Sequence, residues 1–427
     1  MKQKKHPPLS GTPRRKLLEP ARDRFYRKLR SPDLFRLTGL TVCLWASFLI
    51  GPGISAAPLY SPTWGFRLDP PVGYSFTGGD GKDRFSFRSS EGASLDLAVY
   101  PSAASVKNLA EDIQKRLVNR GEISFFEYRK KPAALAELQF DDPGRGGMVN
   151  EGWALFLELD PPETGAKGMG GLGTGKPLLL ALAYGPRGRE ELQNLHLSAL
   201  DSLVPTEGDR RAPGPITEYA YPRGAVREVK LPDFDIKTRI HEGDPEAAQA
   251  LVDREFEVLR LGAETALWQE GWIRFYRAIY RDSFERLAET AFVLERFWNT
   301  REGKNGQERD FAEWLLSWIQ SFHYERERMG SDFVNLVSAV VEGRGDCDSR
   351  ALLWAVFLEQ ANIPAAIMVS RDYGHAMGLA DLSGSGARFD LGGKRWLVAE
   401  TTAAVPLGLI GAGVSEISKW LGVTFED

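Results

Sequence analysis

The chain has 427 residues, of which 43% are hydrophobic and 26% charged, a composition typical of a globular protein with two or three domains. Its net charge of −4 is uneven, because residues 1–36 hold 12 basic and 3 acidic side chains and the part after residue 57 has a net charge of −13. A body this acidic argues against nucleic acid, so we expect no nucleic-acid partner.

Residues 1–57 are predicted to be a basic leader followed by a signal or anchor segment. The stretch 37–50 is apolar, Gly51 ends it, and Ser55, Ala56 and Ala57 provide small residues for a signal peptidase. The apolar stretch is short for a membrane span. We therefore expect an exported protein of the cell envelope, periplasmic or extracellular. The alternative is a protein anchored in the inner membrane by residues 37–57.

Residues 62–207 are predicted to form one α+β domain. Apolar and polar residues alternate along 94–100, as they do in a strand with one face on a core. The stretches 106–119 and 187–203 instead carry apolar residues at helical spacing. Strands with one connecting helix and one closing helix indicate an antiparallel sheet covered by helices. Further strands are predicted at 65–68, 84–87, 123–128, 133–140, 153–159 and 178–184.

Two short matches at the ends of this domain resemble the PsbP-type fold of extrinsic photosystem proteins. The domain opens with Trp-Gly-Phe-Arg-Leu-Asp-Pro-Pro-Val-Gly-Tyr at 64–74 and closes with Ser-Ala-Leu-Asp-Ser-Leu at 198–203. The resemblance implies a binding module without enzymatic activity.

The glycine-rich stretch 164–177 contains part of a phosphate-binding motif. Gly170, Gly175 and Lys176 have the required spacing. However, Pro177 stands where Ser or Thr would bind magnesium, and a strand is predicted to follow instead of a helix. We therefore predict a surface hairpin loop at this position.

Residues 208–243 are rich in Gly, Pro and charged residues and are predicted to be a linker. Residues 244–303 are predicted to be helical, with Asp244 as the cap and breaks near Gly262 and Gly271. Aromatic residues recur there at helical spacing, which favours core packing over a ligand site. A further helix with a wide apolar face is predicted at 307–325.

Cys347 is predicted to lie at the start of a helix. Gly343 and Gly345 precede it, and residues 351–360 are strong helix formers without a breaker. A helix N-terminus favours a thiolate, which is the nucleophilic form of cysteine. The other cysteine, Cys43, falls in the leader, so an exported mature chain would hold a single thiol. The alternative is that Cys347 is a small buried hydrophobic residue.

A histidine and a carboxylate follow this cysteine at regular intervals. Strands are predicted at 365–370, 373–381 and 395–400, with His375 in the second and Glu400 at the end of the third. A Cys–His pair requires an imidazole that accepts the thiol proton and a third group that orients the ring. A helix followed by a hairpin can bring Cys347, His375 and Glu400 together.

At these residues the chain resembles the transglutaminase-like superfamily of papain-type thiol enzymes. The resemblance implies a helix-plus-antiparallel-sheet catalytic domain, here 307–427. It also implies a triad in which Cys347 is the nucleophile, His375 the base and Glu400 the orienting acid. The family more often has Asp at the last position, and Asp390 is the second candidate for it. The matching motifs are Gly345-Asp346-Cys347, Gly374-His375-Ala376, and Trp396 with Glu400-Thr401-Thr402.

Two acidic residues, Asp346 and Asp348, flank the cysteine. Negative charges disfavour a thiolate, so we expect both side chains to point away from Cys347 or to pair with Arg350. The alternative is that they only cap the helix.

Three further residues need a role. His323 competes with His375, but it lies beside the apolar face of a helix, which favours a partly buried structural histidine. Gln320 and Tyr324, at the end of the same helix, are candidate donors to an oxyanion.

The resemblance implies an enzyme that acts on peptide or protein amide bonds through an acyl-thioester, without a cofactor. We favour hydrolysis over transfer to an amine, because water is the default acceptor in an open site. The histidines include no His-x-x-x-His pair, so we expect no zinc site. The alternative function is a catalytically inactive binding or scaffold protein of the cell envelope.

Overall fold

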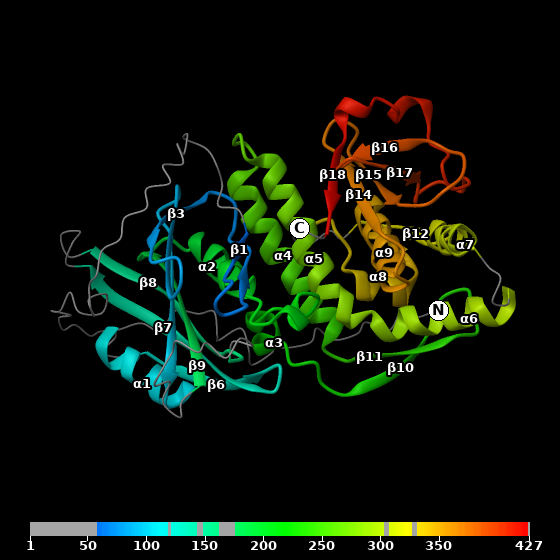
Figure 1. Ribbon diagram of the computed structural model, residues 1–427. Coiled ribbons are helices and arrows are strands. Elements are labelled where there is room, and N and C mark those ends of the chain that lie inside the picture. Colours follow the sequence, from blue (N-terminus) through cyan, green and yellow to red (C-terminus); the bar gives the residue numbers. More distant parts are fainter. Residues whose placement is uncertain are drawn as a thin grey trace, which may run out of the picture.

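The structure, a computed structural model, describes residues 58–117, 121–142, 148–161, 176–302, 307–326 and 331–425. Its fold is α+β, with two main antiparallel sheets and a group of helices between them (Figure 1). The predicted leader and apolar segment, and most of the glycine-rich stretch 164–177, lie outside the described residues. Within the described ranges, no helix is both long enough and apolar enough to cross a bilayer.

The N-terminal sheet is buried on both faces. Its strands lie in the order β3-β4-β5-β9-β8-β7-β6, and all neighbouring pairs are antiparallel. Helix α1 (Val106–Leu117) covers one face and helix α2 (Leu192–Asp201) the other, so Leu180 of β9 faces α1 and Leu179 faces α2. This double cover explains the uninterrupted apolar sequence of β9. The strands are β3 (Tyr74–Gly79), β4 (Arg84–Ser89), β5 (Ser94–Ala103), β6 (Ile123–Tyr128), β7 (Lys131–Asp142), β8 (Met148–Glu158) and β9 (Lys176–Pro186). A small pair, β1 (Leu59–Tyr60) with β2 (Arg67–Leu68), precedes them.

The segment 208–243, predicted as a linker, contains ordered secondary structure. Helix α3 (Pro215–Ala220) is followed by an antiparallel hairpin of β10 (Val226–Lys230) and β11 (Lys237–His241). The N-terminus of α3 is capped from another element, because the Asp201 carboxylate accepts the backbone N–H groups of Ile216 and Thr217. This cap lies 15 residues away from Ile216, so the local sequence pattern does not indicate it.

Four helices follow: α4 (Asp244–Gly262), α5 (Trp268–Arg286), α6 (Ala288–Glu302) and α7 (Glu308–Gln320). The predicted break at Gly262 is confirmed. The break at Gly271 is wrong, because α5 continues through it and ends near Leu287. Asp244 is the first residue of α4 rather than its cap. Its buried carboxylate instead pairs with Arg286 at 2.6 Å, which local sequence does not reveal.

The C-terminal part packs helix α9 (Cys347–Gln360) against a sheet with the strand order β16-β17-β15-β14-β18. The ring of Trp354 in α9 lies where a side chain on Gly378 of β15 would be, since a Cβ there would come within 2.5 Å of the ring. Glycine thus allows close contact between α9 and β15. The strands are β14 (Ala365–Ser370), β15 (His375–Ala380), β16 (Arg388–Leu391), β17 (Lys394–Ala399) and β18 (Leu421–Thr424). Short elements before α9 are β12 (His323–Tyr324), α8 (Leu336–Glu342) and β13 (Arg344–Gly345).

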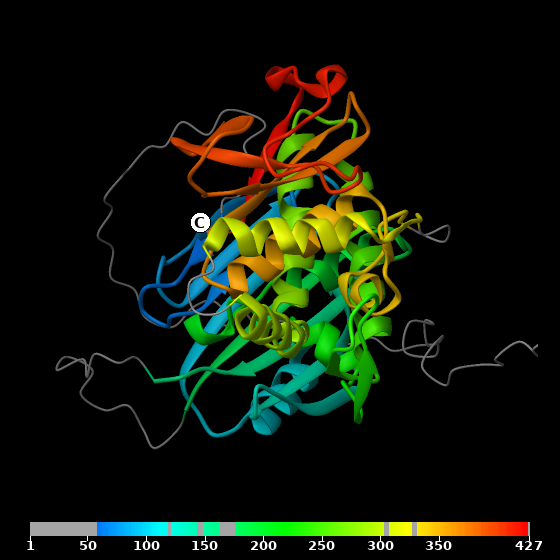
Figure 2. The same cartoon turned by 90° about the vertical axis from the view of Figure 1, so that its right-hand side faces the viewer.

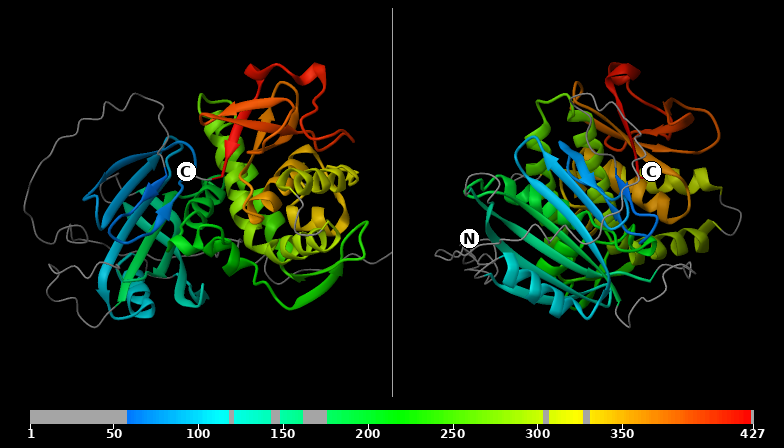
Figure 3. Two further views of the ribbon diagram at one scale, coloured as in Figure 1. Left: turned by 45° about the vertical axis from the view of Figure 1, so that its right-hand side comes forward. Right: turned by 60° about the vertical axis from the view of Figure 1, so that its left-hand side comes forward.

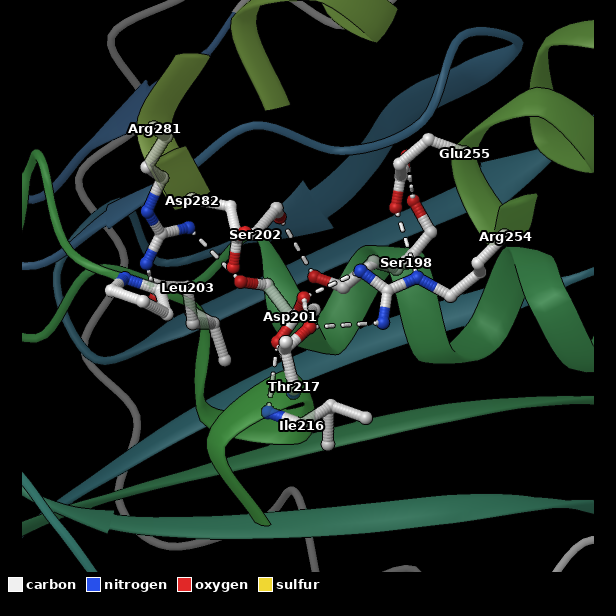
Figure 4. A network of polar contacts seen from close by, with 12 residues as sticks. Ser198, Asp201, Ser202, Leu203, Ile216, Thr217, Arg254, Glu255, Arg281 and Asp282 are labelled. Atoms are coloured by element: carbon white, nitrogen blue, oxygen red, sulfur yellow. Dashed lines mark hydrogen bonds and ion pairs between the residues drawn. The ribbon is translucent and has the colours of Figure 1, made fainter. Parts of the chain in front are cut away.

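Helices α4 and α5 join the two parts. Both lie between the N-terminal sheet and the C-terminal sheet (Figures 1 and 3), and in the view from the C-terminal side the N-terminal sheet lies behind the other elements (Figure 2). On one side α4 packs against α2, and on the other α5 packs against α9 and β18. A polar network reinforces the contact between α4 and α2, since Glu255 of α4 accepts a hydrogen bond from Ser198 of α2 (Figure 4). Glu255 also accepts a hydrogen bond from Arg274 of α5.

His196 in α2 is a buried histidine, and no group among the described residues makes a hydrogen bond of normal geometry with its ring nitrogens. Burial lowers its pKa from 6.5 to about 4, because the charged ring would lose its hydration. The folded state therefore binds this proton less readily than the unfolded state. The contribution of His196 to stability is complete above about pH 6.5 and is lost as the pH falls towards 4.

We expect the pH-dependent contribution of His196 to the free energy of unfolding to reach about 3 kcal/mol, at roughly 1.4 kcal/mol for each pKa unit. The measurement is the urea midpoint of the full-length protein from pH 4 to pH 8, beside His196→Leu. The difference in unfolding free energy between the two proteins should change in favour of the variant below about pH 6.5. A difference that does not change with pH would contradict the lowered pKa.

Candidate active site

Cys347 is the first residue of α9, so the predicted position at a helix start is confirmed. Asp346 is the N-cap, and its carboxylate accepts the backbone N–H and the hydroxyl of Ser349. The helix is buried along most of its length on every side. The side chain of Cys347 therefore has a fixed place between the core and the sheet.

His375 and Glu400 form a hydrogen-bonded pair. His375 begins β15 and Glu400 directly follows β17, and these neighbouring strands bring His375 Nε2 to 2.8 Å from Glu400 Oε2. The other carboxylate oxygen accepts the backbone N–H and the hydroxyl of Thr402 at 2.7 and 2.6 Å. Burial alone would raise the pKa of Glu400, but the hydrogen bonds from His375 and Thr402 hold it below its usual value.

This pair determines which ring nitrogen can act as a base. An ionised Glu400 accepts the proton on Nε2 of His375, so in the neutral ring Nδ1 is the acceptor. Gln320 supports the same strand end, because its amide donates to the carbonyls of Glu400 and Val405. Both amide hydrogens are thereby used, and the prediction that Gln320 donates to an oxyanion is wrong.

The sulfur of Cys347 lies beside the start of β15 and beside a carboxylate. The backbone N–H of Ala376, the residue after His375, lies close enough to the sulfur to lower the pKa of the thiol. The thiol itself donates to Asp348 Oδ2 at 3.6 Å. Among the described residues, Cys347 and His375 make no hydrogen bond with each other. Burial raises the pKa of the thiol well above its usual value, and the charges of Asp348 and Asp346 raise it further.

Of the two flanking carboxylates, Asp346 caps the helix, which was the alternative given for both, whereas Asp348 departs from the prediction. Asp348 faces the sulfur and does not pair with Arg350, whose guanidinium donates to the carbonyls of Gly345, Phe322 and Thr401. Burial raises the pKa of both Asp346 and Asp348. The prediction failed because Arg350 reaches main-chain carbonyls whose places depend on other elements.

Asp348 is held by a residue that the sequence analysis did not assign to the site. The hydroxyl of Tyr276 in α5 donates to Asp348 Oδ1 at 2.6 Å. Tyr276 is fully buried and has the helical spacing of a core residue, so its sequence pattern indicates packing alone. Asp348 is also close enough to His375 for the imidazole to lower the carboxyl pKa, in opposition to burial.

The alternative residues lie apart from the pair. Asp390 on β16 is exposed and 3.5 Å from Arg395, so it is not the acid beside the imidazole. His323 is exposed in β12, rather than partly buried as predicted. Tyr324 is half exposed with its ring near Arg350, and its role as an oxyanion donor stays a prediction. No cluster of three or more His, Cys, Asp or Glu residues in the described ranges could hold a metal ion.

No family model matches the chain, and none of the curated proteins matches it. Among solved structures, PsbP from Synechocystis sp. PCC 6803 is 10% identical with a TM-score of 0.24, covering 38% of this chain and 98% of PsbP. Two proteins described as "putative" proteases are each 11% identical. The match to the cysteine protease from Cytophaga hutchinsonii covers 79% of this chain and 72% of the protease chain, with a TM-score of 0.22. The match to the protease from Parabacteroides distasonis covers 78% of this chain and 70% of the protease chain, with a TM-score of 0.19.

We expect Asp348→Asn to make Cys347 more reactive, because it removes a negative charge beside the sulfur. The pKa of the thiol should fall, and alkylation by iodoacetamide near pH 8 should become roughly tenfold faster for each unit of that fall. The rate is measured against pH in a Cys43→Ala background. The control is Asp372→Asn, an exposed residue in the turn before β15. Superimposable profiles for Asp348→Asn and its parent would show that Asp348 does not control the thiol.

Proposed function

We propose that the chain is a transglutaminase-like cysteine enzyme that cleaves peptide or protein amide bonds. The observation that carries this proposal is the hydrogen bond of 2.8 Å between His375 Nε2 and Glu400 Oε2. The next residue on the same strand, Ala376, places its backbone N–H close enough to Cys347 to lower the pKa of the thiol. An oriented imidazole next to a cysteine at a helix N-terminus has the composition of a thiol-enzyme site.

The proposed reaction uses each of the three side chains. Nδ1 of His375 takes the proton of the Cys347 thiol, and the sulfur attacks the amide carbonyl carbon. When the C–N bond breaks, the imidazolium gives its proton to the leaving amine and an acyl-thioester remains on Cys347. Water, deprotonated by His375, attacks the thioester, and the sulfur leaves as a thiol again. Glu400 stabilises the imidazolium throughout.

The same thioester could pass to an amine, which would make the enzyme a transglutaminase. We favour water because it is present at far higher concentration than any amine. We also propose that the protein is exported to the cell envelope, on the strength of the basic leader and the apolar stretch 37–50. Retention of that stretch as an inner-membrane anchor is the alternative.

One observation favours a second candidate function, a catalytically inactive binding or scaffold protein. The thiol donates to Asp348 rather than to His375, and its pKa is raised by burial and by both flanking carboxylates. A thiol in this state is a weak nucleophile at neutral pH. Catalysis therefore requires that substrate binding moves the thiol proton from the Asp348 side to the imidazole.

We expect the full-length protein to cleave members of a fluorogenic peptide library, and Cys347→Ser to abolish cleavage. Glu400→Gln should lower kcat on the order of 10²- to 10⁴-fold with a small effect on KM, because it leaves the imidazolium without its counter-charge. The matched control is Asp390→Asn, which removes an exposed carboxylate of the same domain.

Cleavage that persists in Cys347→Ser would exclude the thiol mechanism. Library peptides that bind equally to the wild type and to Cys347→Ser, without turnover by either, would favour the inactive binding protein. A product with an added amine, detected by mass spectrometry in the presence of a primary amine, would establish transfer in place of hydrolysis.

A further inference from the structure

A cavity of about 590 Å³ lies where the N-terminal part meets the central helices. Its walls come from β1, β2, α2, the residues after α2, α4, α5 and Phe425 beyond β18. Small-molecule sites commonly have volumes of roughly 300–1,000 Å³ and occur between domains. Neither the cysteine nor the His–Glu pair lines this cavity, so it is a separate candidate site.

The lining of the cavity is cationic. Among the described residues that line it, seven are arginines and five are carboxylates, an excess of two positive charges. Arg254 pairs with Asp201 and Glu255, and Arg274 also pairs with Glu255. Burial would raise the pKa of both carboxyl groups, but these guanidinium groups hold it below its usual value, so the carboxylates are ionised. In this network the positive charges of two arginines are matched by two carboxylates, which leaves no net charge on this wall of the cavity.

Arg281 of α5 is not balanced in this way. Its Nη1 and Nη2 donate to the main-chain carbonyls of Asp201 and Leu203, both at 2.9 Å (Figure 4). Within the described part of the chain it has no ion pair with a carboxylate, and its Nε has no hydrogen-bond partner. The adjacent Asp282 is engaged by Arg286 at 2.8 Å. Carbonyl dipoles orient a guanidinium without cancelling its charge. The nearest opposite charge is that of Asp201, whose carboxyl pKa Arg281 helps to lower, but this carboxylate is already paired with Arg254, so the wall at Arg281 attracts an anion.

Two further features suit an organic anion. Arg210 is partly exposed at the cavity and is held by Glu207 at 2.9 Å, so its guanidinium is positioned before a ligand arrives. Phe425 stacks on Tyr280 with ring centroids 4.2 Å apart, which adds an aromatic wall. Guanidinium groups match carboxylate and phosphate oxygens in pairs.

We propose that this cavity binds a small oxyanion, a carboxylate or phosphate compound, through Arg281 and Arg210. The proposal does not depend on the chemistry of Cys347. Binding is tested by isothermal titration and by thermal unfolding of the full-length protein, with inorganic pyrophosphate in one series and citrate in another. Sodium chloride keeps the ionic strength constant, because exposed charges respond to salt alone. We expect saturable binding of at least one probe and a Tm that rises with its concentration.

Arg281→Gln and Arg210→Gln should each weaken the apparent affinity about tenfold or more, since each removes a charge-assisted contact. The control is Arg239→Gln, which removes an exposed arginine that pairs with Glu289 outside the cavity. If Arg281→Gln does not fold, Arg210→Gln decides the question. Saturation by pyrophosphate alone or citrate alone identifies the ligand as phosphate or carboxylate. The proposal fails if neither probe saturates, or if a folded cavity variant keeps the wild-type affinity.

Discussion

The burial of helix α9 determines both where Cys347 lies and how its sulfur behaves. The helix is enclosed by other helices on one side and by the sheet on the other, and Gly378 lets the ring of Trp354 approach β15 closely. This contact sets the position of the helix start relative to the strand that carries His375. The same enclosure removes water from the sulfur, which makes the thiolate costly. The packing that fixes the position of Cys347 therefore also lowers the reactivity of its thiol.

The polar and charged groups around the sulfur have opposite effects on the stability of a thiolate. The N-terminus of α9 and the backbone N–H of Ala376 stabilise a thiolate, whereas Asp346 and Asp348 destabilise it. If His375 acts as proposed, its imidazolium offsets the charge of Asp348, whose pKa it already lowers. Glu400 and Thr402 already hold the ring in the tautomer that accepts a proton. Under the proposed function, the state of the thiol depends on whether Asp348 or His375 receives its proton.

Sequence reasoning succeeded where the signal is local. The helix start at Cys347 and the strands of His375 and Glu400 follow from glycine placement, helix formers and short apolar stretches, and all are present. It failed where a partner comes from elsewhere in the chain. The cap of α3 comes from Asp201, and the hydroxyl that holds Asp348 comes from Tyr276. Such contacts depend on tertiary packing, which a single sequence does not display.

The last strand completes the sheet in an order that has a consequence for biosynthesis. β18 pairs with the edge of β14 that β15 leaves free, and Arg277 and Tyr280 of α5 contact Thr424 and Phe425. Until residue 424 has left the ribosome, the backbone groups along that edge of β14 lack their partner strand. A truncated chain would keep this edge open to pairing with other molecules. The segment 421–425 is therefore a poor place for a truncation, although it is far from the cysteine in sequence.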